Sequence, residues 1–140
     1  MRESSRYWTK PLIHPEYPNP NQNRYLNSVL NLECSLPPSE VLIGLQSIER
    51  QLGRVRENEL HPWSPRTIDL DIIAAGDEVI DTAELTVPHP RAVERDFVLI
   101  PILEVCPDWV HPVIGKTVSL LISELSEVNI LEKYQAEGPV

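Results

Sequence analysis

The run from Arg66 to Ile73 alternates polar and apolar residues. Alternate side chains of a strand point to opposite faces, so the pattern predicts a strand with Asp69 and Asp71 on one face and Leu70 on the other. Successive side chains on one face of a strand lie roughly 7 Å apart. The two carboxylates are therefore predicted to lie close enough to share one cation or to hold two.

Two other segments are predicted to be strands, and the second of them shows the same alternation. They run from Met1 to Trp8 and from Tyr25 to Cys34. In the second segment, Tyr25 and Asn27 share one face, and the leucines occupy the opposite face. We therefore expect one polar and one apolar face on this strand.

Apolar residues at helical spacing predict the helices. One helix is predicted to begin near Ser39, which can serve as its N-cap, and to end at Gly53. Two more are predicted over residues 97–105 and around residues 118–125. The segment from Lys10 to Arg24 is rich in proline and is predicted to be a long loop.

The order of these elements indicates a fold class. Strands of alternating polarity that are separated by helices predict an α+β fold, with an antiparallel or mixed sheet covered by helices on one side. A chain of 140 residues can bury one core, so we expect a single domain over residues 1–140.

Composition and charge disfavour several classes of protein. The net charge is -9 and no basic stripe is present, which argues against nucleic-acid binding. There is no apolar run long enough to span a membrane and no basic, apolar N-terminal signal, so we expect a cytoplasmic protein without a membrane partner. The two cysteines, Cys34 and Cys106, are expected to be buried free thiols rather than a bridge or metal ligands.

Arginines gather near the aspartate pair although the chain as a whole is acidic. Arg54, Arg56 and Arg66 all precede Asp69 by a short distance. Two aspartates on one strand face repel each other unless something neutralises them. Carboxylates suit Mg²⁺, and arginines suit the phosphate oxygens that the metal leaves unneutralised. The cluster fits a site for a Mg²⁺-bound nucleotide. The alternative interpretation is an aspartate pair that simply lies on the solvent-exposed face of an edge strand.

Four spaced blocks of the chain, in this order, closely resemble the 6-hydroxymethyl-7,8-dihydropterin pyrophosphokinases of folate biosynthesis. The blocks are Gly53–Arg56, Trp63–Ile72, Leu85–Pro90 and Arg95–Pro101. The resemblance runs from about Ser4 to about Leu125. Members of that family open with a strand and a Gly-Ser-Asn turn before a long helix, and this chain has no counterpart of them. The resemblance therefore implies a ferredoxin-like α/β sandwich that is truncated at its N-terminus, and a monomer once that segment is present.

The resemblance also implies a reaction and a set of site residues. The reaction is transfer of pyrophosphate from ATP to 6-hydroxymethyl-7,8-dihydropterin, which releases AMP, with two Mg²⁺ ions held by the two aspartates. The residues implied in catalysis are Arg54, Arg66, Asp69 and Asp71. Those implied on the ATP side are Gln46, Glu49, Arg56, Trp63, Ile72, Leu85, His89 and Arg95. Those implied on the pterin side are Thr9, Leu12, Tyr25, Asn27 and Phe97.

The chain departs from the family pattern at a few positions. These are Pro90, Glu84 and a longer loop between Arg56 and Trp63, and such changes could weaken ATP binding. An inactive homologue that binds pterin or nucleotide without catalysis is the alternative function. A metal-dependent nuclease is disfavoured because the chain lacks a basic face.

Overall fold

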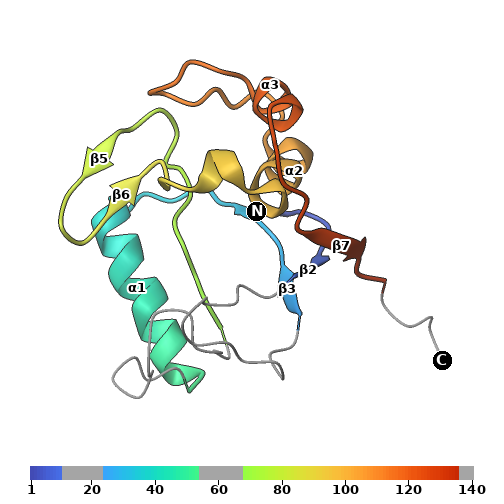
Figure 1. Ribbon diagram of the computed structural model, residues 1–140. Helices are drawn as coiled ribbons and strands as arrows, with labels where there is room; N and C mark the ends of the chain where they lie inside the picture. The colour runs from blue at the N-terminus through green and yellow to red at the C-terminus, as the bar shows by residue number, and fades with distance from the viewer. Residues whose placement is uncertain (11–23, 54–67, 136–140) are drawn as a thin grey trace, which may run out of the picture. The chain divides into compact units, whose positions relative to one another are not determined.

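The computed structural model describes residues 1–10, 24–53 and 68–135 (Figure 1). These residues fall into two compact units. The first unit comprises the described residues of Met1–Pro11, Asn23–Glu33 and Pro90–Val140. The second comprises those of Cys34–His89. Each unit contains helix and antiparallel strand, so the predicted α+β class is confirmed, and the elements are consistent with a ferredoxin-like fold.

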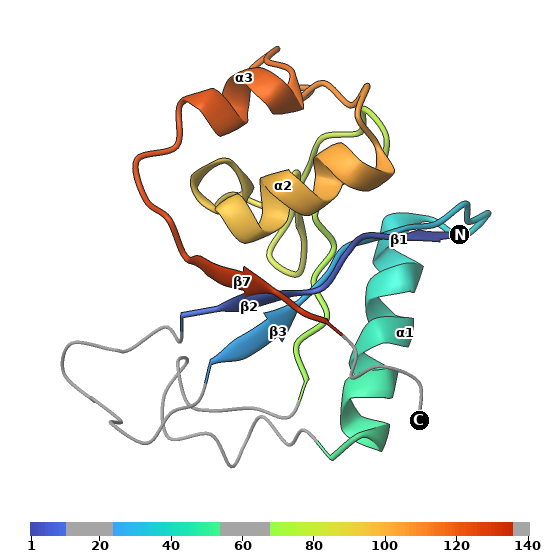
Figure 2. The same cartoon turned by 90° about the vertical axis from the view of Figure 1, so that its right-hand side faces the viewer.

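The first unit is built on a three-stranded antiparallel sheet in the order β3-β2-β7 (Figure 2). Its strands are β2 (Tyr7–Thr9), β3 (Tyr25–Asn27) and β7 (Ile130–Lys133). Tyr7 pairs with Asn27, and Thr9 pairs with Tyr25. Because cross-strand partners share a face, these four side chains lie on the same side of the sheet.

Helix α2 (Asp96–Val105) lies across one face of this sheet, and α3 (Val118–Ser123) packs against α2 (Figure 2). The 3-10 helix η2 (Ala92–Glu94) leads into α2. The core between these helices is apolar, and both Leu99 and Val118 are fully buried. The Thr117 hydroxyl caps α3 by accepting the Leu120 N–H at 3.2 Å.

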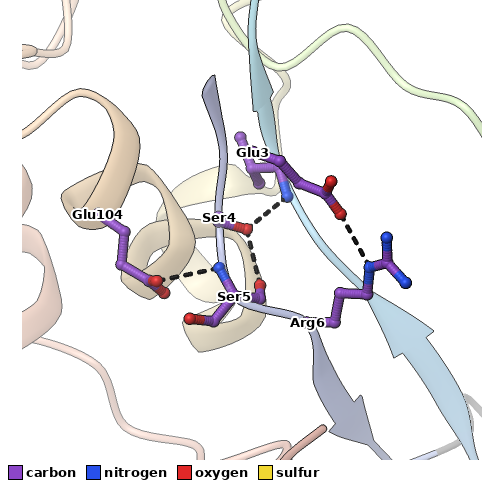
Figure 3. Close-up of polar contacts among 6 residues, drawn as sticks. Glu3, Ser4, Ser5, Arg6 and Glu104 are labelled. Carbon is purple, nitrogen blue, oxygen red and sulfur yellow. Dashed lines mark hydrogen bonds and ion pairs between the residues drawn. The ribbon is translucent and has the colours of Figure 1, made fainter. Parts of the chain in front are cut away.

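The N-terminal segment is fixed to α2 by a polar cluster (Figure 3). The Ser5 N–H donates to Glu104 Oε1 at 3.0 Å, and the Tyr7 hydroxyl donates to Glu104 Oε2. The Ser4 hydroxyl accepts the Val29 N–H at 2.9 Å. The short ladder of β1 (Arg2–Glu3) with β4 (Leu30–Asn31) begins beside this cluster.

The same cluster shifts two pKa values. Burial alone would raise the pKa of Glu104, but the hydrogen bonds from Tyr7 and Ser5 outweigh it, and the pKa of Glu104 lies below its usual value. Burial, together with the hydrogen bond to Glu104, raises the pKa of Tyr7 to about 12. The carboxylate is therefore stabilised in its charged form and the phenol in its neutral form.

The second unit contains helix α1 (Pro38–Gln51) and a hairpin of β5 (Ile80–Asp81) with β6 (Thr86–Val87). The predicted cap was wrong: Ser39 lies inside α1, and Pro37 occupies the N-cap position without a side-chain cap. Proline at the first helical position is tolerated because its missing N–H would have no helical partner. The predicted end is confirmed, since Gly53 follows the helix with φ 94°.

Other predictions met different outcomes. The helices predicted over residues 97–105 and around 118–125 are confirmed as α2 and α3. The strand predicted over Tyr25–Cys34 is broken into β3 and β4, and its leucines at positions 26, 30 and 32 are exposed. Strand β7 was not predicted. Whether the two units make up one domain stays a prediction. Of the loop predicted over Lys10–Arg24, residues 11–23 lie outside the described residues.

The two cysteines are free, as predicted, but their predicted burial was wrong. Cys34 is exposed and Cys106 is partly exposed. None of the helices within the described ranges is long and apolar enough to cross a membrane.

Candidate functional site

The two aspartates lie on an extended segment of the second unit, residues 68–75. Asp69 and Asp71 are exposed, whereas Ile68, Leu70 and Ile72 are half-buried. The two-faced pattern predicted from the sequence is therefore confirmed. Both carboxylates lie at the surface, where a cation with its remaining water ligands could reach them.

The predicted strand at this place was wrong, because residues 68–73 form no ladder. Two contacts with the rest of the unit anchor the backbone instead. The Leu70 N–H donates to Glu49 Oε2 at 2.9 Å, and the Ile73 carbonyl accepts the His89 N–H at 2.8 Å. A strand requires repeated backbone pairs with a neighbour, and a side-chain acceptor at Leu70 takes the place of one such pair.

Glu49 connects helix α1 to the aspartate segment. It lies in the last turn of α1 and is only 2 % exposed. Gln46, one helical turn earlier, is half-buried. The structure buries Glu49 and bonds its carboxylate to the Leu70 N–H, and its implied role on the ATP side stays a prediction.

The hairpin brings a further candidate residue, His89, to this segment. His89 follows β6 and is half-buried, and its backbone bond to Ile73 places it next to the segment that carries the aspartates. Leu85 is buried in the turn of the hairpin, where its N–H and C=O both bond to Thr82. The second unit thus brings together Glu49, both aspartates and His89.

The first unit brings together the residues implied for the pterin side. Thr9, Tyr25 and Asn27 share one face of the sheet. The Asn27 side-chain amide donates to the Thr9 hydroxyl at 2.7 Å, and Thr9 is only 1 % exposed. Tyr25 and Asn27 are half-buried. The bond to Thr9 holds the Asn27 side chain in place and uses one N–H of its amide. The second N–H and the amide oxygen take no part in that bond.

Arg95 and Phe97 lie together at the start of α2. The Arg95 guanidinium carbon is 5.5 Å from the centre of the Phe97 ring, within the range of a cation–π contact. Phe97 is half-buried rather than part of the core. A planar cation and an aromatic ring in contact form a surface that suits a flat, polar ligand.

Asp96, between these two residues, was missed by the sequence reasoning. It is 3 % exposed, and its Oδ2 accepts the N–H groups of Asn129 and Ile130 at 2.9 and 3.0 Å. Its buried Oδ1 has no hydrogen-bond partner within the described part of the chain. Asp96 therefore fixes the start of β7 against α2. The only signal in the sequence was an acidic residue at a helix start, which by itself says nothing about β7.

The family model of 7,8-dihydro-6-hydroxymethylpterin-pyrophosphokinase (HPPK) matches residues 1–107. The chain belongs to this family. The expectation from the four sequence blocks is thereby confirmed.

Three relatives are each named 2-amino-4-hydroxy-6-hydroxymethyldihydropteridine pyrophosphokinase. The chain is 46% identical to that of Synechocystis over 106 residues, 45% identical to that of Bacillus subtilis over 103, and 44% identical to that of Aquifex aeolicus over 114. These matches cover 76%, 74% and 81% of this chain, and 53%, 57% and 67% of the respective relatives. The chain thus spans about half to two thirds of the length of the curated relatives it matches.

The donor set present fits Mg²⁺. Within the described ranges, no three or more His, Cys, Asp or Glu side chains gather as a cage for a metal. Mg²⁺ does not need such a cage, since it commonly binds through one or two carboxylates, several waters and the phosphates of a substrate. The exposed pair Asp69 and Asp71 supplies that kind of site.

Five of the residues implied by the resemblance lie outside the described residues. They are Leu12, Arg54, Arg56, Trp63 and Arg66. Their implied roles stay predictions.

Proposed function

We propose that this chain acts in pyrophosphoryl transfer from ATP to 6-hydroxymethyl-7,8-dihydropterin, a step of folate biosynthesis. The hydroxymethyl oxygen of the pterin attacks the β-phosphorus of ATP. The bond between that phosphorus and the oxygen bridging to the α-phosphate breaks, AMP leaves with the bridging oxygen, and the hydroxyl proton passes to solvent. The products are AMP and the dihydropterin diphosphate.

In the second unit, the exposed carboxylates of Asp69 and Asp71 would hold two Mg²⁺ ions. When bound, these ions would neutralise the phosphate oxygens and make the β-phosphorus easier to attack. His89 would contact a phosphate of ATP, and the half-buried Gln46 and Ile72 would line the nucleotide side together with Leu85. Arg54, Arg56, Arg66 and Trp63 would complete that side. Such reactions are accelerated chiefly by positioning and by neutralising charge.

In the first unit, Tyr25 and Phe97 would pack against the pterin ring, and the Asn27 amide, held by Thr9, would recognise its polar edge. Arg95 lies over Phe97 and would reach a phosphate oxygen. Leu12 would complete the pterin side. A cytoplasmic location, a monomeric state and the absence of a nucleic-acid partner also stay predictions.

The observation that carries this proposal is the placement of Asp69 and Asp71. They are exposed side by side on an extended segment that Glu49 and His89 anchor, in a chain that matches the pyrophosphokinase family over residues 1–107. A structural role for the pair would have favoured burial or a ladder position.

Product analysis tests the proposal. The protein is mixed with ATP, Mg²⁺ and 6-hydroxymethyl-7,8-dihydropterin, and nucleotides and pterins are separated by chromatography. AMP should appear in step with the pterin diphosphate, and neither should form when the pterin or Mg²⁺ is left out. ADP as the main product would point to an ordinary kinase. Binding of both substrates without AMP release would indicate an inactive homologue.

A further inference from the structure

The hydrogen bond from Leu70 to Glu49 acts on the backbone between the two aspartates. In an extended segment, backbone N–H groups point sideways while side chains point up and down. Fixing the Leu70 N–H therefore fixes the rotation of the segment about its own axis. That rotation decides where the carboxylates of Asp69 and Asp71 point.

The burial of Glu49 is unusual for its helix. All of α1 is described, and among its 14 residues Glu49 alone is buried. A buried carboxylate is costly unless hydrogen bonds satisfy it, and a backbone N–H bonded to a carboxylate makes one of the stronger hydrogen bonds in proteins. A helix that buries an acid in place of an apolar residue is using that acid for a specific contact.

We infer that Glu49 is a positioning residue, whose carboxylate holds the Leu70 N–H and thereby sets the two metal-binding aspartates. This inference rests on the proposed metal role of Asp69 and Asp71. It differs from a direct contact between Glu49 and ATP, since a side chain that is 2 % exposed presents little surface to a nucleotide. The effect of Glu49 should thus be visible on metal binding even when no nucleotide is present.

Two substitutions separate the effect of the length of the Glu49 side chain from the effect of its charge. Glu49→Gln keeps the length of the side chain and an acceptor oxygen but loses the charge. Glu49→Asp keeps the charge but is one carbon–carbon bond shorter, about 1.5 Å, so the carboxylate can no longer reach the Leu70 N–H, which is now 2.9 Å away. Glu40→Gln is the matched control, because Glu40 is an exposed acid in the first turn of the same helix.

The experiment measures binding of Mn²⁺, as a stand-in for Mg²⁺, by electron paramagnetic resonance without nucleotide. Hydrogen exchange of the Leu70 amide is followed by NMR in metal-free samples of the same proteins, and thermal melting checks folding. Residues that orient metal ligands typically change metal affinity about 10–100-fold when mutated. Glu49→Asp should weaken Mn²⁺ binding at least about tenfold and speed Leu70 exchange by a similar factor. Glu49→Gln, which keeps an uncharged and weaker acceptor, should change both measurements less than Glu49→Asp does. Glu40→Gln should stay within about threefold of the parent.

Two results would overturn the inference. One is a folded Glu49→Asp variant that keeps both Mn²⁺ affinity and Leu70 protection. The other is a Glu49→Gln variant that loses Mn²⁺ affinity while Leu70 stays protected, because charge and not reach would then matter. A parent that binds Mn²⁺ no better than its Asp69→Ala variant would refute the proposed metal role instead. Leu70 exchange would in that case still decide whether Glu49 holds the segment.

Discussion

Replacing Asp96 with alanine should destabilise the first unit. The substitution removes one buried carboxylate oxygen that accepts two backbone N–H groups, those of Asn129 and Ile130, at 2.9 and 3.0 Å. Ile130 begins β7, which pairs with β2 in the sheet. The change therefore releases the start of a strand from helix α2.

The magnitude follows from two opposing effects. A hydrogen bond to a charged acceptor contributes roughly 1.5–3 kcal/mol, so two bonds would contribute roughly 3–6 kcal/mol. Against this, Asp96 is 3 % exposed and its Oδ1 has no hydrogen-bond partner among the described residues, so removing the carboxylate also removes a cost of burial. We expect a net loss of about 2–4 kcal/mol for Asp96→Ala. Asp96→Asn should lose less, because it keeps one acceptor oxygen.

Equilibrium unfolding in urea measures this loss. With a slope typical of small proteins, the midpoint for Asp96→Ala should fall by roughly 1–2 M. Amide exchange at Asn129 and Ile130 should quicken in the folded protein. Asp108→Ala is the control, since Asp108 is an exposed acid in the same unit, and it should stay within about 0.5 kcal/mol of the parent. A loss below about 0.5 kcal/mol for Asp96→Ala, with both amides still protected, would refute the reasoning.

Three further results are expected. Asp69→Asn or Asp71→Asn should lower the rate of AMP formation more than about 100-fold. Thermal melting should not change, because both side chains are exposed. Near-normal turnover of either variant would contradict the proposed metal role. The pKa of Glu104 in the folded protein lies below its usual 4.5. The charged Glu104 therefore stabilises the folded protein above pH 4.5, and this contribution is lost as the pH falls further. Glu104→Gln should flatten the acid side of a curve of unfolding free energy against pH. Burial and the hydrogen bond to Glu104 raise the pKa of Tyr7 to about 12 from an ordinary 10, so Tyr7 contributes stability below pH 10 that is lost as the pH rises through 12. Ultraviolet titration should detect one of the four tyrosines ionising near 12, and Glu104→Gln should lower that pKa only in part, because burial is the larger cause.

Local patterns predicted the elements that depend on local interactions. Apolar spacing predicted α1 and α2, and Gly53 predicted the end of α1, because helices and their ends are decided by residues within a turn or two. The alternation around Asp69 and Asp71 correctly predicted two exposed carboxylates over half-buried neighbours. The chemistry of the proposed metal site could therefore be inferred from the sequence before its geometry was known.

Elements that depend on distant partners were not predicted. Strand β7 pairs with β2 at the other end of the chain, and only four residues carry its pattern. The strand prediction at residues 66–73 was wrong because the described part of this segment has no partner strand. This part has the right periodicity, but the Leu70 N–H bonds to a helix side chain, the Ile73 carbonyl accepts the His89 N–H, and residues 68–73 form no ladder. Periodicity reports which faces are buried, whereas a ladder requires a partner.

The acidic residues show why burial must be known before a carboxylate is assigned a role. Asp69 and Asp71 are exposed and can accept a cation, while Glu49 and Asp96 are buried and accept backbone N–H groups instead. In each unit a helix thus supplies a buried acid that fixes a segment next to candidate ligand-binding residues. A segment that binds a ligand cannot be covered on every side by a sheet, so its geometry has to be set by contacts with rigid elements behind it. We therefore expect that replacing the exposed carboxylates lowers the proposed activity and leaves the fold intact, whereas replacing the buried ones alters the segments that they fix.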